Sequence, residues 1–187
     1  ISYHLATPIN CLCIQTAYGV IFTSLLLSTV RGAMGHLNQR NIIIGVCGGI
    51  AAYKSADLVR QLQKQGANVR VVMTEGAQAF ITPLTLQALS GNPVHTELLD
   101  AEAERGMGHI ELARWADAII IAPATADVLA KLANGDADNL LTTLVLATAA
   151  PVFVAPAMNQ QMWAQAATQD NCETLCRRNF IFVGPDS

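Results

Sequence analysis

Two residues of this sequence stand in turns where their side chains could do chemistry. His109 lies in residues 108–111 (GHIE), just ahead of a short amphipathic segment. A lone histidine is usually structural or solvated, but one that follows Gly-x-Gly is poorly explained by packing, and an imidazole can exchange a proton near neutral pH. A structural role and a role in proton transfer both stay open for His109 at this point. Asn159 lies in residues 156–163 (PAMNQQMW), where its amide stands at the expected start of a helix and is favoured as the N-cap by residue type. No set of histidines, cysteines and carboxylates has metal-site spacing, so we expect no metal.

A glycine-rich turn, residues 45–52 (GVCGGIAA), could bring a phosphate close to the backbone. Without Cβ atoms, Gly48 and Gly49 would let an anion approach the N–H groups at the start of the next helix, near Ile50. The same residues are equally typical of a tight strand-to-helix turn, and the segment alone does not decide between the two. Its spacing matches neither G-x-G-x-x-G nor the Walker pattern, which disfavours a plain NAD-binding module.

Two further turns carry small or hydroxyl-bearing residues. Residues 74–77 (TEGA) precede Phe80, and Thr74 could donate its hydroxyl to a phosphate or cap a helix. Residues 123–127 (PATAD) could hold a flat ring at van der Waals distance. Asp127 could instead support the first turn of a helix through the helix dipole.

Short β-branched apolar runs alternate with segments of helical period from residue 41 onward, which predicts βαβ units on a parallel sheet. None of the runs alternates with polar residues along its whole length, so most strands should be buried on both faces. We predict an α/β fold: a three-layer doubly wound parallel sheet, flavodoxin-like or Rossmann-like, with strand order 2-1-3-4-5. In such sheets the turns after the strands bind ligands. The predicted strands are 42–46, 69–73, 118–122, 152–155 and 180–183, and helices are expected at 53–62, 82–90, 125–133, 138–147, 159–168 and 171–178.

Composition limits the classes of function. The 187 residues are 52% hydrophobic and 13% charged, which favours one domain with buried parallel strands or extensive subunit contacts. The net charge of -3 and the scattered Lys and Arg residues predict no nucleic-acid partner. Five cysteines without paired spacing predict neither a disulfide framework nor a zinc site and favour a reducing cytoplasm.

Residues 1–40 differ from the rest. An apolar stretch spans residues 17–30, with no Lys or Arg before it. A secretory signal needs a basic start and a membrane-spanning helix needs about 20 apolar residues, so neither is favoured and we expect no membrane association. We expect the native start at Met34, with residues 1–40 as a leader outside the fold and residues 41–187 as one domain.

Five segments together resemble the homo-oligomeric flavin-containing cysteine decarboxylases, over residues 41–187. The segments are 48–54 (GGIAAYK), 108–112 (GHIEL), 122–127 (APATAD), 134–141 (NGDADNLL) and 156–163 (PAMNQQMW). Within this family the sequence is most similar to the branch that acts in coenzyme A biosynthesis. Asp127, which stands where peptide-acting members have Asn, favours that branch.

The resemblance implies an FMN-dependent lyase that decarboxylates 4'-phosphopantothenoylcysteine to 4'-phosphopantetheine, as a homotrimer or a dodecamer of trimers. It implies that His109 is the essential histidine and that Asn159 holds the substrate carboxylate. The implied cofactor-binding residues are Gly48, Gly49, Ile50, Thr74, Phe80, Pro123, Ala124, Thr125, Ala126 and Asp127. The implied substrate-binding residues are Asn139, Met158, Asn159 and Met162.

The sequence departs from the family pattern at its end. The family's proton-donating cysteine lies on a flap shortly after residues 184–187 (GPDS), so we expect the domain to be truncated before the substrate flap, and a ligase domain to follow in the full-length protein. Two other functions stay open: decarboxylation of peptidyl cysteine, and a flavin-binding regulatory subunit that inhibits a phosphatase.

Overall fold

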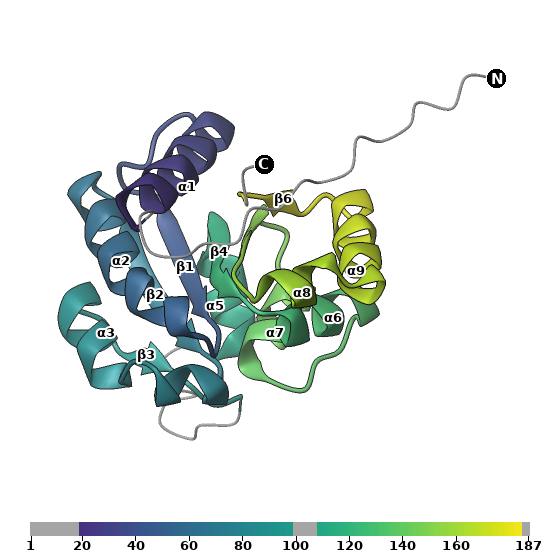
Figure 1. Ribbon diagram of the computed structural model, residues 1–187. Helices are drawn as coiled ribbons and strands as arrows, with labels where there is room; N and C mark the ends of the chain where they lie inside the picture. Colours follow the sequence, from purple (N-terminus) through teal and green to yellow (C-terminus); the bar gives the residue numbers. More distant parts are fainter. Residues whose placement is uncertain (1–18, 99–107, 185–187) are drawn as a thin grey trace.

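A single parallel sheet organises the chain. The computed structural model describes residues 19–98 and 108–184 (Figure 1). All strand pairs are parallel, in the order β3-β2-β1-β4-β5-β6. The strands are β1 (Asn41–Val46), β2 (Asn68–Met73), β3 (Val94–His95), β4 (Ala118–Ala124), β5 (Val152–Pro156) and β6 (Ile181–Phe182). The helices are α1 (Gly19–Met34), η1 (Ile50–Tyr53), α2 (Lys54–Lys64), η2 (Glu75–Ala79), α3 (Pro83–Ser90), α5 (His109–Trp115), α6 (Ala126–Asn134), α7 (Leu140–Ala147), α8 (Gln160–Ala164) and α9 (Ala166–Arg177).

The predicted fold class and strand order are confirmed. The five predicted strands correspond to β1, β2, β4, β5 and β6, which lie in the order 2-1-3-4-5 when numbered along the chain. The sheet also contains β3, a two-residue edge strand that the sequence analysis did not predict. Residues 1–18, the first part of the expected leader, and residues 185–187, which precede the expected flap, lie outside the described part of the chain.

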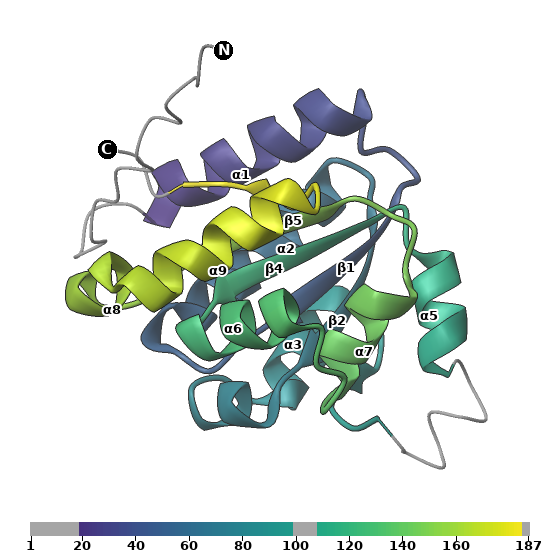
Figure 2. The same cartoon turned by 90° about the vertical axis from the view of Figure 1, so that its right-hand side faces the viewer.

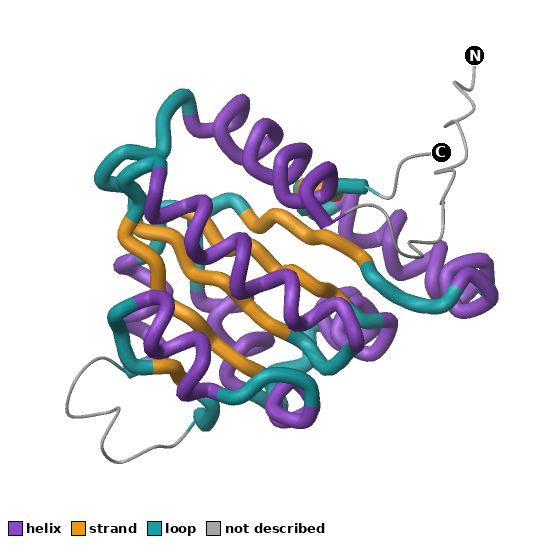
Figure 3. Tube along the Cα trace, turned by 60° about the vertical axis from the view of Figure 1, so that its left-hand side comes forward, coloured by secondary structure: helices purple, strands orange, loops and turns teal. Residues whose placement is uncertain are grey.

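Both faces of the sheet are covered by helices (Figures 2 and 3). Along β1, Ile42 and Ile44 belong to one hydrophobic cluster, whereas Ile43 belongs to the other. This alternation follows from the pleat, which points successive side chains to opposite faces. The first cluster lies against α1, α2 and α3, and the second lies against α5, α6, α7 and α9. Every residue of β4 is buried, as expected for a central strand of a doubly wound sheet.

Helix α1 contradicts the expectation that residues 1–40 lie outside the fold. Leu26 and Val30, one helical turn apart, are fully buried in the cluster shared with α2, and Leu37 in the following loop is buried too. The exposed face of α1 carries Ser24, Ser28 and Arg31 at helical spacing. Small hydroxyl residues mark a polar face only weakly, so the inward-packing side was easily missed in the sequence.

The ends of several helices follow the predicted signals. Thr82 accepts a hydrogen bond from the Thr85 N–H at the start of α3, and Gly91 ends that helix in the left-handed conformation. The predicted helix 159–168 is instead divided into α8 and α9, because Gln165 adopts an extended conformation between them. Among the described residues, no helix is both long enough and apolar enough to span a bilayer.

Candidate functional site

The carboxyl ends of β1, β2, β4 and β5 meet along one edge of the sheet, because the strands are parallel. Two backbone hydrogen bonds join the turns at this edge. The Thr74 N–H donates to the Val46 carbonyl at 3.0 Å, and the Ala157 N–H donates to the Ala124 carbonyl at 2.9 Å. Residues that the sequence analysis selected on four separate turns are therefore held in neighbouring positions.

The two glycines after β1 have different surroundings. A Cβ placed on Gly48 would lie 2.7 Å from the carbonyl carbon of Gly76, so Gly48 is needed for close approach of the turn after β2. The sequence suggests the approach of a phosphate as one reason for this glycine, and the structure adds a contact within the protein itself. A Cβ on Gly49 would meet only the Thr125 methyl group, at 3.9 Å.

Gly49 therefore faces space that a ligand could use. It adopts an extended conformation just before η1, and η1 leads directly into α2. No side chain caps the start of η1, and Ile50, its first residue, is 81% exposed. Backbone N–H groups at such a helix start can bind an anion such as a phosphate.

The turn after β2 places a hydroxyl and an aromatic ring at the same edge. Thr74 precedes η2 but its side chain does not cap that helix. Its hydroxyl donates to the Val46 carbonyl at 3.5 Å, the outer limit for a hydrogen bond, so the hydroxyl is only weakly held. Phe80, which follows η2, is 49% exposed.

The turn after β4 is lined by small residues and rests on a buried thiol. Pro123 and Ala124 are buried, and Thr125 caps α6 by accepting a hydrogen bond from the Val128 N–H at 3.3 Å. Beneath this turn, burial raises the pKa of the Cys47 thiol to about 12, and the Asp127 carboxylate acts in the same direction, whereas a hydrogen bond with the Thr125 backbone acts against them. Cys47 is therefore a neutral thiol at physiological pH.

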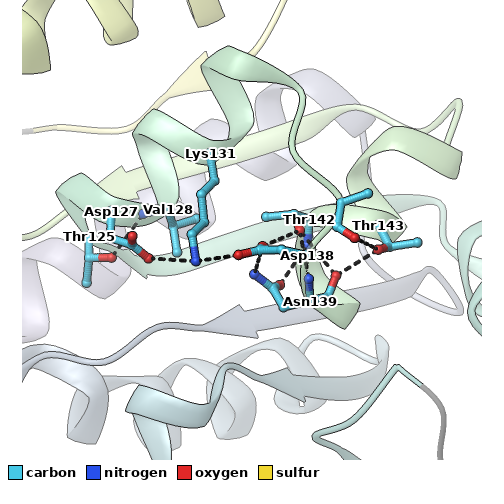
Figure 4. A network of polar contacts seen from close by, with 9 residues as sticks. Thr125, Asp127, Val128, Lys131, Asp138, Asn139, Thr142 and Thr143 are labelled. Atoms are coloured by element: carbon cyan, nitrogen blue, oxygen red, sulfur yellow. Dashed lines mark hydrogen bonds and ion pairs between the residues drawn. The ribbon is translucent and has the colours of Figure 1, made fainter.

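A network of polar contacts connects this turn to the start of α7 (Figure 4). Lys131 on α6 pairs with Asp127 at 3.4 Å and with Asp138 at 2.8 Å. Asn139 caps α7, because its Oδ1 atom accepts a hydrogen bond from the Thr142 N–H at 3.0 Å. The network thus links two predicted site residues, Asp127 and Asn139. Sequence reasoning missed Lys131, although a Lys four residues after an Asp on a helix indicates an ion pair.

The turn after β5 combines capping with exposed side chains. The Asn159 Oδ1 atom accepts a hydrogen bond from the Gln161 N–H at 2.8 Å, so Asn159 is the N-cap of α8, as one of its two interpretations predicted. Met158 is half-buried and packs against the second hydrophobic cluster, and Met162 is 48% exposed. Trp163 is buried in the core.

His109 is the first residue of α5 and is half-buried. Leu112 and Ala113 anchor this short helix in the second hydrophobic cluster, and the Thr148 hydroxyl after α7 donates to the Ala113 carbonyl at 3.3 Å. The helix that begins at His109 thus lies on the face of the sheet that also carries α6 and α7. The catalytic role of His109 stays a prediction.

Comparisons with known proteins identify relatives in sequence and in fold. A family model described as Flavoprotein matches residues 31–187. The Coenzyme A biosynthesis bifunctional protein CoaBC of Escherichia coli (strain K12) is 60% identical over 151 residues, which are 81% of this chain and 37% of that protein. The protein of the same name from Vibrio cholerae is 58% identical over 152 residues, 81% of this chain and 38% of that protein. The chain thus spans less than two fifths of these relatives.

Two solved structures share the fold over most of their length. The FMN-dependent cysteine decarboxylase SpaF has a TM-score of 0.73 and 37% identity, covering 78% of this chain and 84% of that one. A PPC decarboxylase mutant complexed with pantothenoylaminoethenethiol has a TM-score of 0.67 and 31% identity, covering 80% of this chain and 84% of that one.

Proposed function

The chain belongs to the flavoprotein family, and from this premise we propose that it binds FMN and decarboxylates 4'-phosphopantothenoylcysteine in coenzyme A biosynthesis. The observation that carries the proposal is the convergence of four strand-end turns at one edge of the sheet, in a chain 60% identical to a coenzyme A biosynthesis protein. The reaction is inferred from the names of the relatives, and the residues that could carry it out lie in these turns.

The turns suit the two parts of FMN. The open space at Gly49 and the uncapped start of η1 fit a phosphate, which would accept hydrogen bonds from backbone N–H groups. The weakly held hydroxyl of Thr74 can turn toward the same anion. Residues 123–127 and the exposed ring of Phe80 offer small and apolar surfaces for a flat ring system. The remaining predicted cofactor contacts, Gly48, Ile50 and Asp127, border the same turns.

Bound FMN would supply a two-electron acceptor that oxidises the cysteine side chain to a thioaldehyde. Loss of carbon dioxide then leaves a carbanion that is delocalised onto sulfur as an enethiolate. In this scheme Asn159 donates hydrogen bonds to the carboxylate, and the half-buried His109 exchanges a proton with the substrate. An aminoethenethiol is the group that such a decarboxylation would form, and the solved PPC decarboxylase relative holds a compound carrying that group.

Substrate contacts are assigned to residues at the same edge. Asn139, Met158 and Met162 follow β4 and β5 in the chain and lie at or near the starts of α7 and α8. We further propose, from the resemblance, that the protein acts in the cytoplasm as a homotrimer or a dodecamer of trimers, and that a ligase domain accompanies it in the full-length protein. The length of the relatives supports the last point.

Two measurements test the proposal. The absorbance spectrum of the purified protein should show flavin bands, directly or after reconstitution with FMN. Anaerobic mixing with 4'-phosphopantothenoylcysteine should then release carbon dioxide, measured together with the mass of the product. A peptide ending in cysteine is the matched substrate control and should release none. Absence of flavin binding refutes the cofactor assignment, and carbon dioxide from the peptide alone refutes the substrate assignment.

A further inference from the structure

Lys131 lies between two carboxylates that belong to different elements. Its ammonium group is 3.4 Å from Asp127 in the first turn of α6 and 2.8 Å from Asp138, just before α7 (Figure 4). The side chains of the two aspartates are 69% and 51% exposed. Exposed ion pairs contribute little to stability, so we look for the role of these contacts in the geometry of the segment between α6 and α7, which they connect.

Asp138 transmits this geometry to Asn139. One oxygen of Asp138, Oδ2, pairs with Lys131, and the other, Oδ1, accepts a hydrogen bond from Asn139 Nδ2 at 2.8 Å. The Oδ1 atom of Asn139 accepts the Thr142 N–H at 3.0 Å. Both ends of the Asn139 carboxamide are therefore held, and the direction of the second hydrogen on Nδ2 is fixed.

The charges support the same chain of contacts. The hydrogen bond from Lys131 is the main cause that lowers the pKa of Asp138. In return, the hydrogen bond with Asp138 is the main cause that raises the pKa of Lys131. An ionised Asp138 can only accept hydrogen bonds, which is what the Asn139 nitrogen requires.

We propose that Lys131 is a positioning residue of the decarboxylase: it holds Asp138, and through Asp138 it orients the Asn139 carboxamide toward the substrate. The inference rests on the proposed function, in which Asn139 contacts 4'-phosphopantothenoylcysteine. Lys131 itself touches neither substrate nor cofactor in this scheme. It acts on the binding of the substrate and leaves the chemical step unchanged.

Kinetics of three variants test the inference. Lys131→Met should raise KM for 4'-phosphopantothenoylcysteine about fivefold or more, with kcat within about twofold of the wild type, because a binding contact is misdirected. Lys131→Arg keeps the positive charge and should restore most of the affinity. Lys64→Met is the matched control, since Lys64 is an exposed lysine in the last turn of α2, away from this network. An unchanged KM in Lys131→Met overturns the inference.

Amide hydrogen exchange separates this inference from the proposed function. The Thr142 and Thr143 N–H groups bond to Asn139 at the start of α7, so they should exchange faster in Lys131→Met than in Lys64→Met. This readout needs no activity. If the wild type releases no carbon dioxide, the proposed function fails. If exchange at α7 is unchanged, Lys131 does not position Asn139, whatever the activity.

Discussion

Replacement of Gly48 by alanine tests the close approach between the turns after β1 and β2. The added Cβ would lie 2.7 Å from the carbonyl carbon, 2.8 Å from the oxygen and 3.0 Å from the Cα atom of Gly76. All three atoms belong to the backbone, so no side-chain rotation relieves the overlap. The turn that contains Gly76 has to move away from Gly48.

The expected cost follows from this geometry. Overpacking of a methyl group against a fixed neighbour costs about 1–3 kcal/mol. For a chain of this size, 1 kcal/mol lowers the melting temperature by about 2–4 °C, so Gly48→Ala should lower it by about 2–12 °C. Gly49→Ala is the matched control: its Cβ meets the Thr125 methyl at 3.9 Å and its backbone is extended, so stability should change by less than about 0.5 kcal/mol.

The assay is thermal and urea denaturation of the flavin-free proteins, followed by FMN titration. Gly48→Ala should have a lower melting temperature than the wild type. Gly49→Ala should have the melting temperature of the wild type but bind FMN more weakly, because its methyl group fills the space assigned to the phosphate. Equal stability of Gly48→Ala and the wild type would refute the close approach. Unchanged FMN affinity in Gly49→Ala would refute the placement of the phosphate.

Three further predictions concern packing, a thiol and catalysis. Leu26→Ala should destabilise the protein by about 2–5 kcal/mol in urea denaturation, because Leu26 is fully buried, and an unchanged midpoint would show that α1 is not docked. Iodoacetamide at pH 8, followed by peptide mapping, should modify the exposed Cys176 and spare Cys47, which is buried and whose pKa is raised to about 12. Labelling of Cys47 in the folded protein would contradict its burial. The pKa of Cys47 is higher in the folded than in the unfolded protein, so its contribution to the stability of the fold is complete below the unfolded pKa and is lost as the pH rises toward 12. Asn159→Asp should retain the cap on the Gln161 N–H and hence the fold, yet nearly abolish carbon dioxide release, because a second carboxylate repels that of the substrate. His109→Asn should also nearly abolish carbon dioxide release. Full activity in either variant removes that residue from the mechanism.

Much of the fold could be predicted because a strand that is buried on both faces is an apolar run with turn residues at its end. β4 is the plainest case, with seven buried residues. β3 could not be predicted, since two residues, Val94–His95, form no pattern. The break at Gln165 was also missed, because no glycine or proline marks it. The docking of α1 was missed because its exposed side is marked mainly by the small hydroxyl residues Ser24 and Ser28, which give a weak amphipathic pattern.

The candidate site was predictable to a smaller extent. The fold class indicates which turns lie together, so residues that follow β1, β2, β4 and β5 could be selected before the structure was known. The contacts that explain why individual residues are needed were harder to predict. Gly48 faces Gly76, and Lys131 reaches Asp138 across a turn, and both contacts arise from the way separate segments meet.

The short outer strands have a consequence for how copies of this chain can meet. Both edges of the sheet are formed by strands of two residues, β3 (Val94–His95) and β6 (Ile181–Phe182). Growth of a sheet from one molecule into the next requires a row of unpaired backbone N–H and C=O groups, and these edges offer very little of it. Within the described residues, the proposed association of copies would therefore depend on the side chains of helices and turns. Exposed apolar residues of that kind, among them Ile50 and Phe80, lie at the edge where the strand-end turns meet, so the proposed assembly and the proposed FMN site would use the same surface.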